Sequence, residues 1–217
     1  MKLKVDLHMH TKYSHDGFME VSDVIRGAER AGLDCVAVTD HDTCAAIPGV
    51  LKAGKKAGML VIPGIEIKSR HGDILGLGIT EVVERGMSAK DTVSKIHELG
   101  GVAVAAHPYS LVFHPTGVRG EVKSAGFDAI EVFNSRTYFS NGMAYRVAKS
   151  RGIPMVASSD AHLVGEIGNS YSIVDCKRDV SSILDEVRAG RTKVVGGLTG
   201  LGSIMSWYWQ RLRRVIR

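Results

Sequence analysis

Short apolar segments alternate with amphipathic segments along most of the chain. Runs rich in valine, isoleucine, leucine and alanine predict buried strands, and apolar residues that recur every three or four positions predict helices between them. The predicted strands are Leu3–Leu7, Cys35–Thr39, Leu60–Pro63, Val102–Ala106, Ala129–Phe133, Met155–Ala157, Ser170–Val174 and Lys193–Val195. The predicted helices are Val21–Ala31, Cys44–Ala57, Ala89–Leu99, Gly142–Ser150 and Val180–Ala189. A further pair of strands, Ile65–Lys68 and Asp73–Ile79, predicts a hairpin.

The order of these elements indicates an α/β fold. Strands that are apolar throughout are typical of parallel strands covered by helices on both faces. A closed barrel and an open doubly wound sheet share this pattern. No linker or shift in composition occurs before about Gly200. We therefore expect one barrel-like domain over residues 1–200, followed by a C-terminal helix over residues 201–217.

Composition narrows the class of protein further. Of the 217 residues, 44% are hydrophobic and 24% charged, as in ordinary soluble globular proteins. The chain has no apolar run long enough to cross a bilayer, and its start does not resemble a signal peptide. Three cysteines, Cys35, Cys44 and Cys176, lack the spacing of a disulfide framework or a zinc ribbon. We expect a cytoplasmic protein.

The positive charge is concentrated in the last residues. The net charge is +5, and four arginines after Gln210 supply four of these charges, which leaves +1 for residues 1–210. On a helical wheel one side of the C-terminal helix carries Leu201, Ile204, Met205, Tyr208, Leu212, Val215 and Ile216. The other side carries Arg211, Arg213, Arg214 and Arg217, with Trp207 among them. The simplest interpretation is an amphipathic basic helix packed on the barrel. A homodimer contact, an anionic membrane surface and a nucleic acid are alternatives.

Metal-binding side chains recur at the ends of successive predicted strands. His8 and His10 end the first strand, and residues two apart on a strand point to the same side, so these two can hold one ion together. The strand ends carry His8, His10, His41, Glu66, His107, Glu131, Asn134, Asp160 and His162, with His15 and Asp16 in the first loop. In a parallel barrel these ends share one face, where active sites are built.

The types of these side chains indicate the ions. Imidazoles and carboxylates without thiolates suit Mn²⁺, Zn²⁺ or Fe²⁺, and their number exceeds the needs of one ion, so two or three divalent ions are predicted. His97 inside a predicted helix, His114 and the hairpin residue His71 are interpreted as ordinary structural or surface residues. Either His15 or Asp16 is expected to be a metal ligand in the first loop.

Six motifs, DLHMHTKYSHDG, VTDHDT, PGIEI, AAHP, IEVFN and SSDAH, occur in this order. Together they resemble the polymerase-and-histidinol-phosphatase (PHP) family of metal-dependent phosphoesterases. The resemblance implies a distorted seven-stranded (β/α) TIM-like barrel. It places the metal ligands at His8, His10, Asp16, His41, Glu66, Asp73, His107, Asp160 and His162. Glu66 would bridge two ions. Asp73 stands where members of the family commonly have a histidine.

The resemblance also implies hydrolysis of phosphate esters by a metal-activated hydroxide. Asp160 is expected to orient this nucleophile or take its proton, and His162 to polarise the phosphate through its metal. Arg136 is the preferred phosphate clamp, because arginine binds phosphate bidentately, whereas Lys12 and Arg119 are weaker candidates. Asn134 is expected to hold the loop of Arg136.

Two further side chains have open roles. Asp6 and Asp40 stand next to predicted ligand histidines and are expected either to fix imidazole tautomers or to cap strand ends.

The predicted substrates are phosphorylated small molecules or nucleic-acid ends. Among these, nucleotides or oligonucleotide 5′ ends are the preferred candidates. The segment from Thr80 to Gly101 has room for only a turn and one helix, so we expect no large lid. Histidinol phosphate or another small phosphomonoester is the main alternative. A non-catalytic scaffold subunit of an RNA-processing complex is a third hypothesis, which would require the loss of ligands.

Overall fold

A single nine-stranded sheet forms the centre of the described chain. The structure is a computed structural model that describes residues 1–110 and 117–216, and side chains as far as Arg214. His114 therefore lies outside the described residues. The strand order is β7-β6-β5-β4-β3-β2-β1-β8-β9. The strands are β1 (Lys2–Asp6), β2 (Cys35–Val38), β3 (Leu60–Lys68), β4 (Asp73–Leu77), β5 (Val102–Ala105), β6 (Ala129–Asn134), β7 (Met155–Ser158), β8 (Tyr171–Asp175) and β9 (Thr192–Val195).

The sheet curls until its two edges nearly meet. The edge strand β7 lies against β8 and β9, which belong to the opposite edge. Strands β1, β2 and β3 run parallel, as do β5, β6 and β7. In contrast, β4 is antiparallel to both β3 and β5, and β8 is antiparallel to β1 and β9. The predicted barrel-like α/β fold is confirmed.

The predicted number of seven strands is wrong for this chain, because the described residues form nine. The predicted strand at Leu60–Pro63 and the first arm of the predicted hairpin are one nine-residue strand, β3. It continues through Pro63 and Gly64, since Pro63 pairs with Val38 of β2 and Gly64 with Leu77 of β4. Long-range pairing on both sides keeps this strand extended across two residues that usually interrupt strands.

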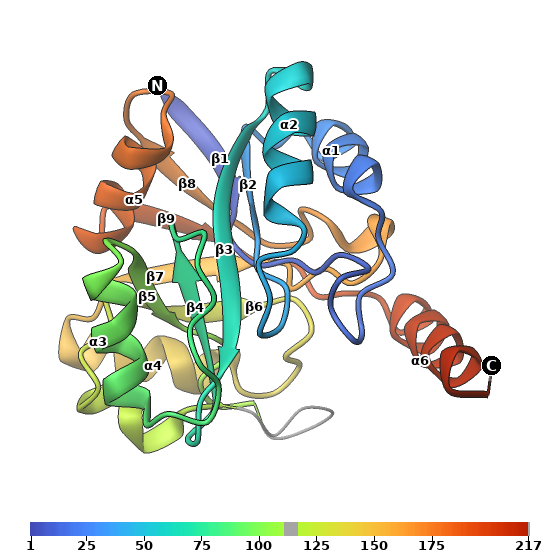
Figure 1. Ribbon diagram of the computed structural model, residues 1–217. Coiled ribbons are helices and arrows are strands. Elements are labelled where there is room, and N and C mark those ends of the chain that lie inside the picture. Colours follow the sequence, from blue (N-terminus) through green and yellow to red (C-terminus); the bar gives the residue numbers. More distant parts are fainter. Residues whose placement is uncertain (111–116, 217) are drawn as a thin grey trace.

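Apolar side chains fill the barrel and the space under its helices. Leu3, Val5 and Ile62 belong to a fully buried interior cluster. Two other clusters pack the sheet against α1 and α2 on one side and α3 and α4 on another (Figure 1). The helices are α1 (Val21–Arg30), α2 (Ile47–Ala57), α3 (Ala89–Glu98), α4 (Asn141–Arg151), α5 (Val180–Arg188) and α6 (Leu201–Ile216). None of the helices in the described ranges has the length and apolar character that crossing a membrane requires.

The C-terminal helix α6 lies at one side of the barrel and contacts the loop that follows β1 (Figure 1). Its packing side differs from the one that the helical wheel favoured. Ile204 and Trp207 are buried, whereas Leu201, Met205 and Leu212 from the predicted apolar side are 69%, 67% and 51% exposed. Dimerisation through this exposed side stays a prediction.

Candidate metal centre

The strand topology brings the predicted ligands to one end of the barrel. His8 and His10 follow β1, His41 follows β2, and Glu66 lies near the end of β3. His107 follows β5, and both Asp160 and His162 follow β7. Asp73 opens β4, and because β4 runs antiparallel, its first residue lies at the same end as the last residues of β3. Lys68 is the direct cross-strand partner of Asp73.

Glu66 lies at the centre of the cluster, with four imidazoles around its carboxylate. Its Oε2 atom lies 3.2 Å from His8 Nε2, from His10 Nε2 and from His41 Nδ1. Its Oε1 atom lies 3.1 Å from His107 Nε2. The two oxygens therefore face different groups of donors, an arrangement that suits a carboxylate shared between ions.

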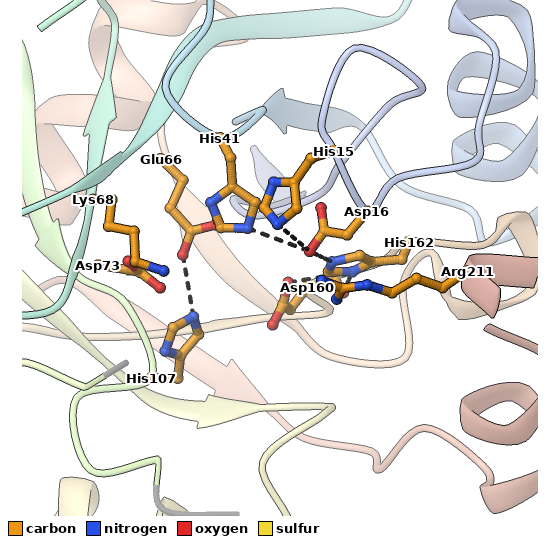
Figure 2. A pocket seen from close by; sticks show the side chains of 10 residues that line it. All are labelled: His15, Asp16, His41, Glu66, Lys68, Asp73, His107, Asp160, His162 and Arg211. Carbon is orange, nitrogen blue, oxygen red and sulfur yellow. Dashed lines mark hydrogen bonds and ion pairs between the residues drawn. The ribbon is translucent and has the colours of Figure 1, made fainter. Parts of the chain in front are cut away.

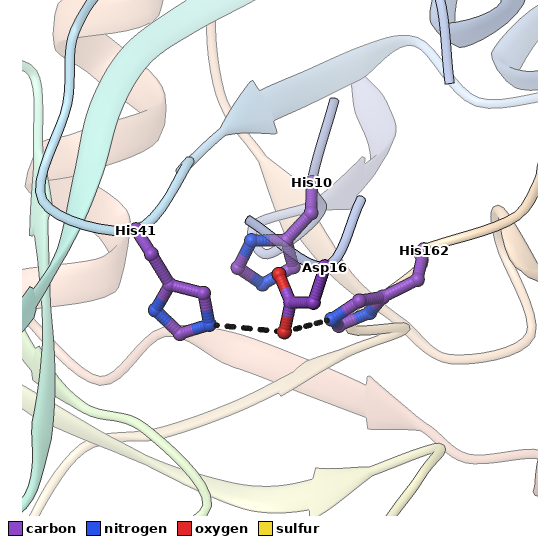
Figure 3. Close-up of side chains that lie close together, drawn as sticks. All are labelled: His10, Asp16, His41 and His162. Atoms are coloured by element: carbon purple, nitrogen blue, oxygen red, sulfur yellow. Dashed lines mark hydrogen bonds and ion pairs between the residues drawn. The ribbon is translucent and has the colours of Figure 1, made fainter. Parts of the chain in front are cut away.

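A second carboxylate, Asp16, joins the histidines on the other side. Its Oδ2 atom lies 3.2 Å from His162 Nε2 and 3.5 Å from His41 Nε2, and Figure 3 shows these side chains converging with His10. Asp160 Oδ1 lies 3.2 Å from His10 Nε2 and 3.5 Å from His8 Nε2.

These separations fit a shared divalent ion. Two atoms that each bind one ion at about 2.1 Å, at octahedral or tetrahedral angles, lie about 3.0 to 3.4 Å apart. Eight of the nine predicted ligands fall into three overlapping groups whose donor atoms lie within 4.8 Å of one another. His10, Asp16, His41 and His162 form one group, His8, His10 and Asp160 another, and His8, Glu66 and His107 a third. Asp73 is in none of these groups, although it lines the same cavity.

Neighbouring groups set the orientation of the histidine rings. Glu131 Oε1 lies 3.0 Å from His8 Nδ1. Since a carboxylate oxygen only accepts, the neutral ring donates through Nδ1 and offers Nε2 to an ion. Ser14 Oγ lies 3.0 Å from His10 Nδ1. The carbonyl oxygen of Asp160 lies 2.8 Å from His162 Nδ1.

Asp6 and Asp40 do not fix imidazole tautomers. Asp6 accepts from the backbone N–H groups of Ser159 and Gly168. Asp40 accepts from the N–H and the hydroxyl of Thr11. Of their two predicted roles, the structure supports backbone capping.

Burial and opposite charges shift the pKa values of the cluster in opposite directions. Burial alone would lower the pKa of His10, but Asp160 and Glu66 outweigh it and raise that pKa to about 10. For His107, Glu66 outweighs burial in the same way and raises the pKa to about 9. Burial alone would raise the pKa of Glu66, but the surrounding histidines hold it well below its usual range. Glu66 is therefore ionised, and in the metal-free protein His10 and His107 bind protons where an ion would bind.

Two predicted ligands have strained backbones. His107 has φ of 29° and Asp160 has φ of 53°, a region that residues other than glycine rarely adopt. Such strain persists where the surroundings enforce it, often at functional sites. Here His107 N–H donates to Glu131, and Asp160 N–H donates to the carbonyl of His8.

The donors open into a cavity of about 140 Å³. Figure 2 shows its lining, which consists of His15, Asp16, His41, Glu66, Lys68, Asp73, His107, Asp160, His162 and Arg211. The four carboxylates in this set outnumber its two permanent cations, Lys68 and Arg211, by two. With its histidines neutral, as metal binding requires, the lining therefore favours divalent cations, and it favours anions only after such ions have bound.

Other histidines lie where a structural role explains them. His71 accepts a hydrogen bond from the N–H of Ala89 at the start of α3, and His97 pairs with Asp128. The His15 side chain is 61% exposed, and its Nε2 atom lies 3.9 Å from Asp16 Oδ2. Asp16 is buried within the donor group, so the geometry favours Asp16 over His15.

Arg136 does not line the cavity, contrary to its predicted role as the phosphate clamp. Its Nη1 atom donates to both carboxylate oxygens of the buried Glu166, at 3.0 and 2.9 Å. Its guanidinium also lies 4.7 Å from the ring centroid of Trp207. As predicted, Asn134 holds this loop, since its side-chain oxygen accepts from the Arg136 N–H. Burial, followed by the charge of Arg136, lowers the pKa of His162, which keeps this ring neutral.

The weaker clamp candidates lie elsewhere as well. Lys12 pairs with Glu20. Arg119 opens a short 3₁₀ helix, Arg119–Lys123, away from the residues that line the cavity.

Sequence reasoning missed the contribution of α6. The Trp207 indole Nε1–H donates to the carbonyl of Asp16 at 2.8 Å, and the ring lies edge-on to His162 with centroids 5.6 Å apart. Arg211, one turn further along the helix, lines the cavity. The sequence did contain one indication of this packing, because Trp207 is a large aromatic residue among the arginines of the basic side of the helix.

The comparisons with known proteins agree with this fold and site. A PHP-associated family model matches residues 139–192. An uncharacterized protein of Methanocaldococcus jannaschii is 35% identical over 161 residues, which cover 70% of this chain and 92% of that protein. A two-domain protein of Bacteroides vulgatus, whose structure is described as containing a predicted PHP-like metal-dependent phosphoesterase, superposes with a TM-score of 0.76 at 19% identity. The match covers 97% of this chain and 70% of that one.

The chain belongs to the PHP family, as its motifs predicted. A phosphoribosyl 1,2-cyclic phosphate 1,2-diphosphodiesterase of Eggerthella lenta is also similar, with 35% identity over 82 residues that cover 35% of this chain and 31% of that enzyme.

Proposed function

We propose that this protein is a metal-dependent phosphoesterase that acts on nucleotides or oligonucleotide 5′ ends. The observation that carries the proposal is the convergence of eight predicted ligands into three overlapping donor groups around Glu66. A scaffold protein would not need these donors. The names of the relatives from B. vulgatus and E. lenta support phosphoester hydrolysis.

The chain's own residues would hold two or three divalent ions, such as Mn²⁺, Zn²⁺ or Fe²⁺. When bound, such ions activate water and neutralise the charge of a phosphate group. The assigned ligands are His8, His10, Asp16, His41, Glu66, Asp73, His107, Asp160 and His162. Glu66 would bridge ions through its two oxygens. Asp160 would orient the attacking water or take its proton.

The cavity accommodates a phosphate group and little more, so most of the substrate would lie outside it. Ligand pockets for whole small molecules usually measure about 300 to 1,000 Å³, whereas this cavity measures about 140 Å³. A terminal phosphate on a longer molecule fits this shape. So does a small phosphomonoester such as histidinol phosphate, which is the alternative.

A neighbouring hollow favours a substrate that carries a nucleobase. About 250 Å³ in volume, it is lined by Tyr138, Phe139, Met143 and Arg146 among others. Phe139 is 81% exposed, and an exposed aromatic ring beside an arginine is suited to stacking on a base. A chain of hydrogen bonds connects the wall of this hollow with the donor cluster. Thr137 in the lining donates to Asn134, and Asn134 donates to Asp160.

The test is product-resolved hydrolysis of a 5′-phosphorylated RNA oligonucleotide by the manganese-loaded protein. The His8→Ala variant is the negative control, and His71→Ala, which alters a histidine outside the cluster, is the matched positive control. Stepwise release of mononucleotides by the wild type and His71→Ala alone would support the proposal. An intact oligonucleotide together with cleaved histidinol phosphate would support the alternative. A wild type that purifies without metal and cleaves neither would favour the scaffold hypothesis.

A further inference from the structure

Two permanent cations reach the cavity from different elements of the fold. Lys68 comes from the end of β3, next to Asp73, and Arg211 comes from α6, on the side of His162 (Figure 2). The predicted ligands lie between these two positions. An anion held by the centre could therefore contact a cation as well as the ions.

The hydrogen-bond donors of Arg211 are free for a ligand, unlike those of the other arginines nearby. Arg136 is paired with Glu166, and Arg214 donates to the carbonyls of His15 and Gly17. Within residues 1–110 and 117–214, the Arg211 guanidinium makes neither an ion pair nor a hydrogen bond. It lies 5.2 Å from the ring centroid of Trp207. Stacking on an aromatic ring orients the guanidinium and leaves its N–H groups at the edge available.

The helix that carries Arg211 is fixed to the loop that carries Asp16. Trp207 is 1% exposed, and its indole N–H donates to the Asp16 carbonyl. Ser203 Oγ donates to Glu166 at 2.7 Å. Together with the Arg214 contacts, these bonds hold both ends of the buried side of α6, and Arg211 lies between Trp207 and Arg214 along the helix.

We infer that α6 completes the active site and that Arg211 binds substrate, donating hydrogen bonds from its guanidinium group to a phosphate oxygen beside the ions. The inference rests on the proposed phosphoesterase function. Two divalent ions would turn the cavity's excess of two negative charges into an excess of two positive charges, which matches a phosphate dianion. A charged donor with geometry for two oxygens is the natural complement to such an anion. Arg211 takes the role that the sequence assigned to Arg136.

Binding of inorganic phosphate to the manganese-loaded full-length protein tests this inference, measured by isothermal titration calorimetry. Arg211→Ala should weaken phosphate binding by about 10- to 100-fold, the usual loss for a hydrogen bond to a charged group. Arg213→Ala is the matched control, because Arg213 lies on the same helix, stacks on the exposed Trp209 and does not line the cavity. Its phosphate affinity should equal that of the wild type, whereas Arg211→Lys should lie in between.

The outcomes separate the inference from the proposed function. If the wild type hydrolyses phosphate esters but Arg211→Ala binds phosphate as tightly, the role of Arg211 is overturned and the function stands. If Arg211→Ala alone loses phosphate binding while the wild type hydrolyses no ester, Arg211 binds phosphate and the function fails. If the wild type neither binds phosphate nor hydrolyses an ester, both are overturned.

Tryptophan fluorescence tests the docking of α6 without any assay of activity. The chain has two tryptophans, and in Trp209→Phe all tryptophan emission comes from Trp207. We expect this emission to be shifted to the blue, to resist quenching by acrylamide, and to change when Zn²⁺ is added, because the ring touches His162 and Asp16. Emission like that of free tryptophan would overturn the docked helix, and with it the position of Arg211.

Discussion

The Nε2 atoms of His8 and His10 lie 3.1 Å apart in the barrel interior, and both rings are fully buried. Two imidazoles with their lone pairs this close repel each other unless a proton or a metal ion lies between them. Both rings also lie within 3.2 Å of the same Glu66 oxygen. This relationship indicates a pair of ligands for one ion.

Replacement of either histidine should abolish high-affinity metal binding. In His8→Ala we expect metal affinity to fall by more than about 100-fold, because His8 belongs to two of the three donor groups. His71→Ala should retain its metal, since that ring caps a helix. Metal content after dialysis, measured by inductively coupled plasma mass spectrometry, distinguishes the two. Full occupancy in His8→Ala would refute the assignment.

Glu131 should control the affinity of the centre without being a ligand. One of its oxygens faces His8 Nδ1, and the other accepts from the His107 N–H at 2.7 Å. Glu131→Gln keeps the shape but weakens the orientation of His8, so metal affinity should fall by about 10- to 100-fold. Competition with a chelating dye measures the change. An unchanged affinity would show that His8 is oriented by packing alone.

Metal binding should release protons and strengthen as the pH rises. In the metal-free protein the pKa of His10 is about 10 and that of His107 about 9, because nearby carboxylates outweigh burial. Both rings are thus protonated at neutral pH, and the pKa values of His8 and His41 are raised as well, so at least about two protons should be released when ions bind. Calorimetry in buffers with different ionisation enthalpies counts these protons. Affinity that is constant between pH 6 and pH 9 would contradict this view.

Gly17 should be required for the position of Asp16. A Cβ atom at Gly17 would lie 2.0 Å from the carbonyl oxygen of Thr11, so the loop would have to move. Gly17→Ala should therefore weaken metal binding and disturb the hydrogen bond from Trp207 to Asp16. Gly142→Ala in α4 is the control, because its added Cβ would contact nothing within 4 Å. Metal titration of both variants is decisive, and equal affinities would show that the loop adapts.

The sequence predicted the parts of this molecule that depend on local pattern. Strand ends, helices and the order of metal-binding residues all follow from short segments, and these predictions locate the donor cluster. The predictions that were wrong depend on long-range contacts. Pro63 and Gly64 predict the end of a strand, and only their pairing with β2 and β4 shows that β3 continues through them. Arg136 looks like a clamp until Glu166, thirty residues later, is seen to bind it. Trp207 is buried because of a bond to Asp16, 191 residues away, which no helical wheel can indicate.

Arg136 should stabilise the fold and should not bind substrate. Its guanidinium neutralises Glu166, which is fully buried and also accepts from the backbone of His162. Arg136→Ala leaves that carboxylate without its counter-charge, and such losses typically lower the free energy of unfolding by about 3 to 5 kcal/mol. Urea denaturation of the metal-free protein measures this. Lys12→Ala, which breaks the exposed pair with Glu20, should leave the transition unchanged. If Arg136→Ala instead unfolds like the wild type but binds phosphate poorly, Arg136 is the clamp and the assignment to Arg211 is wrong.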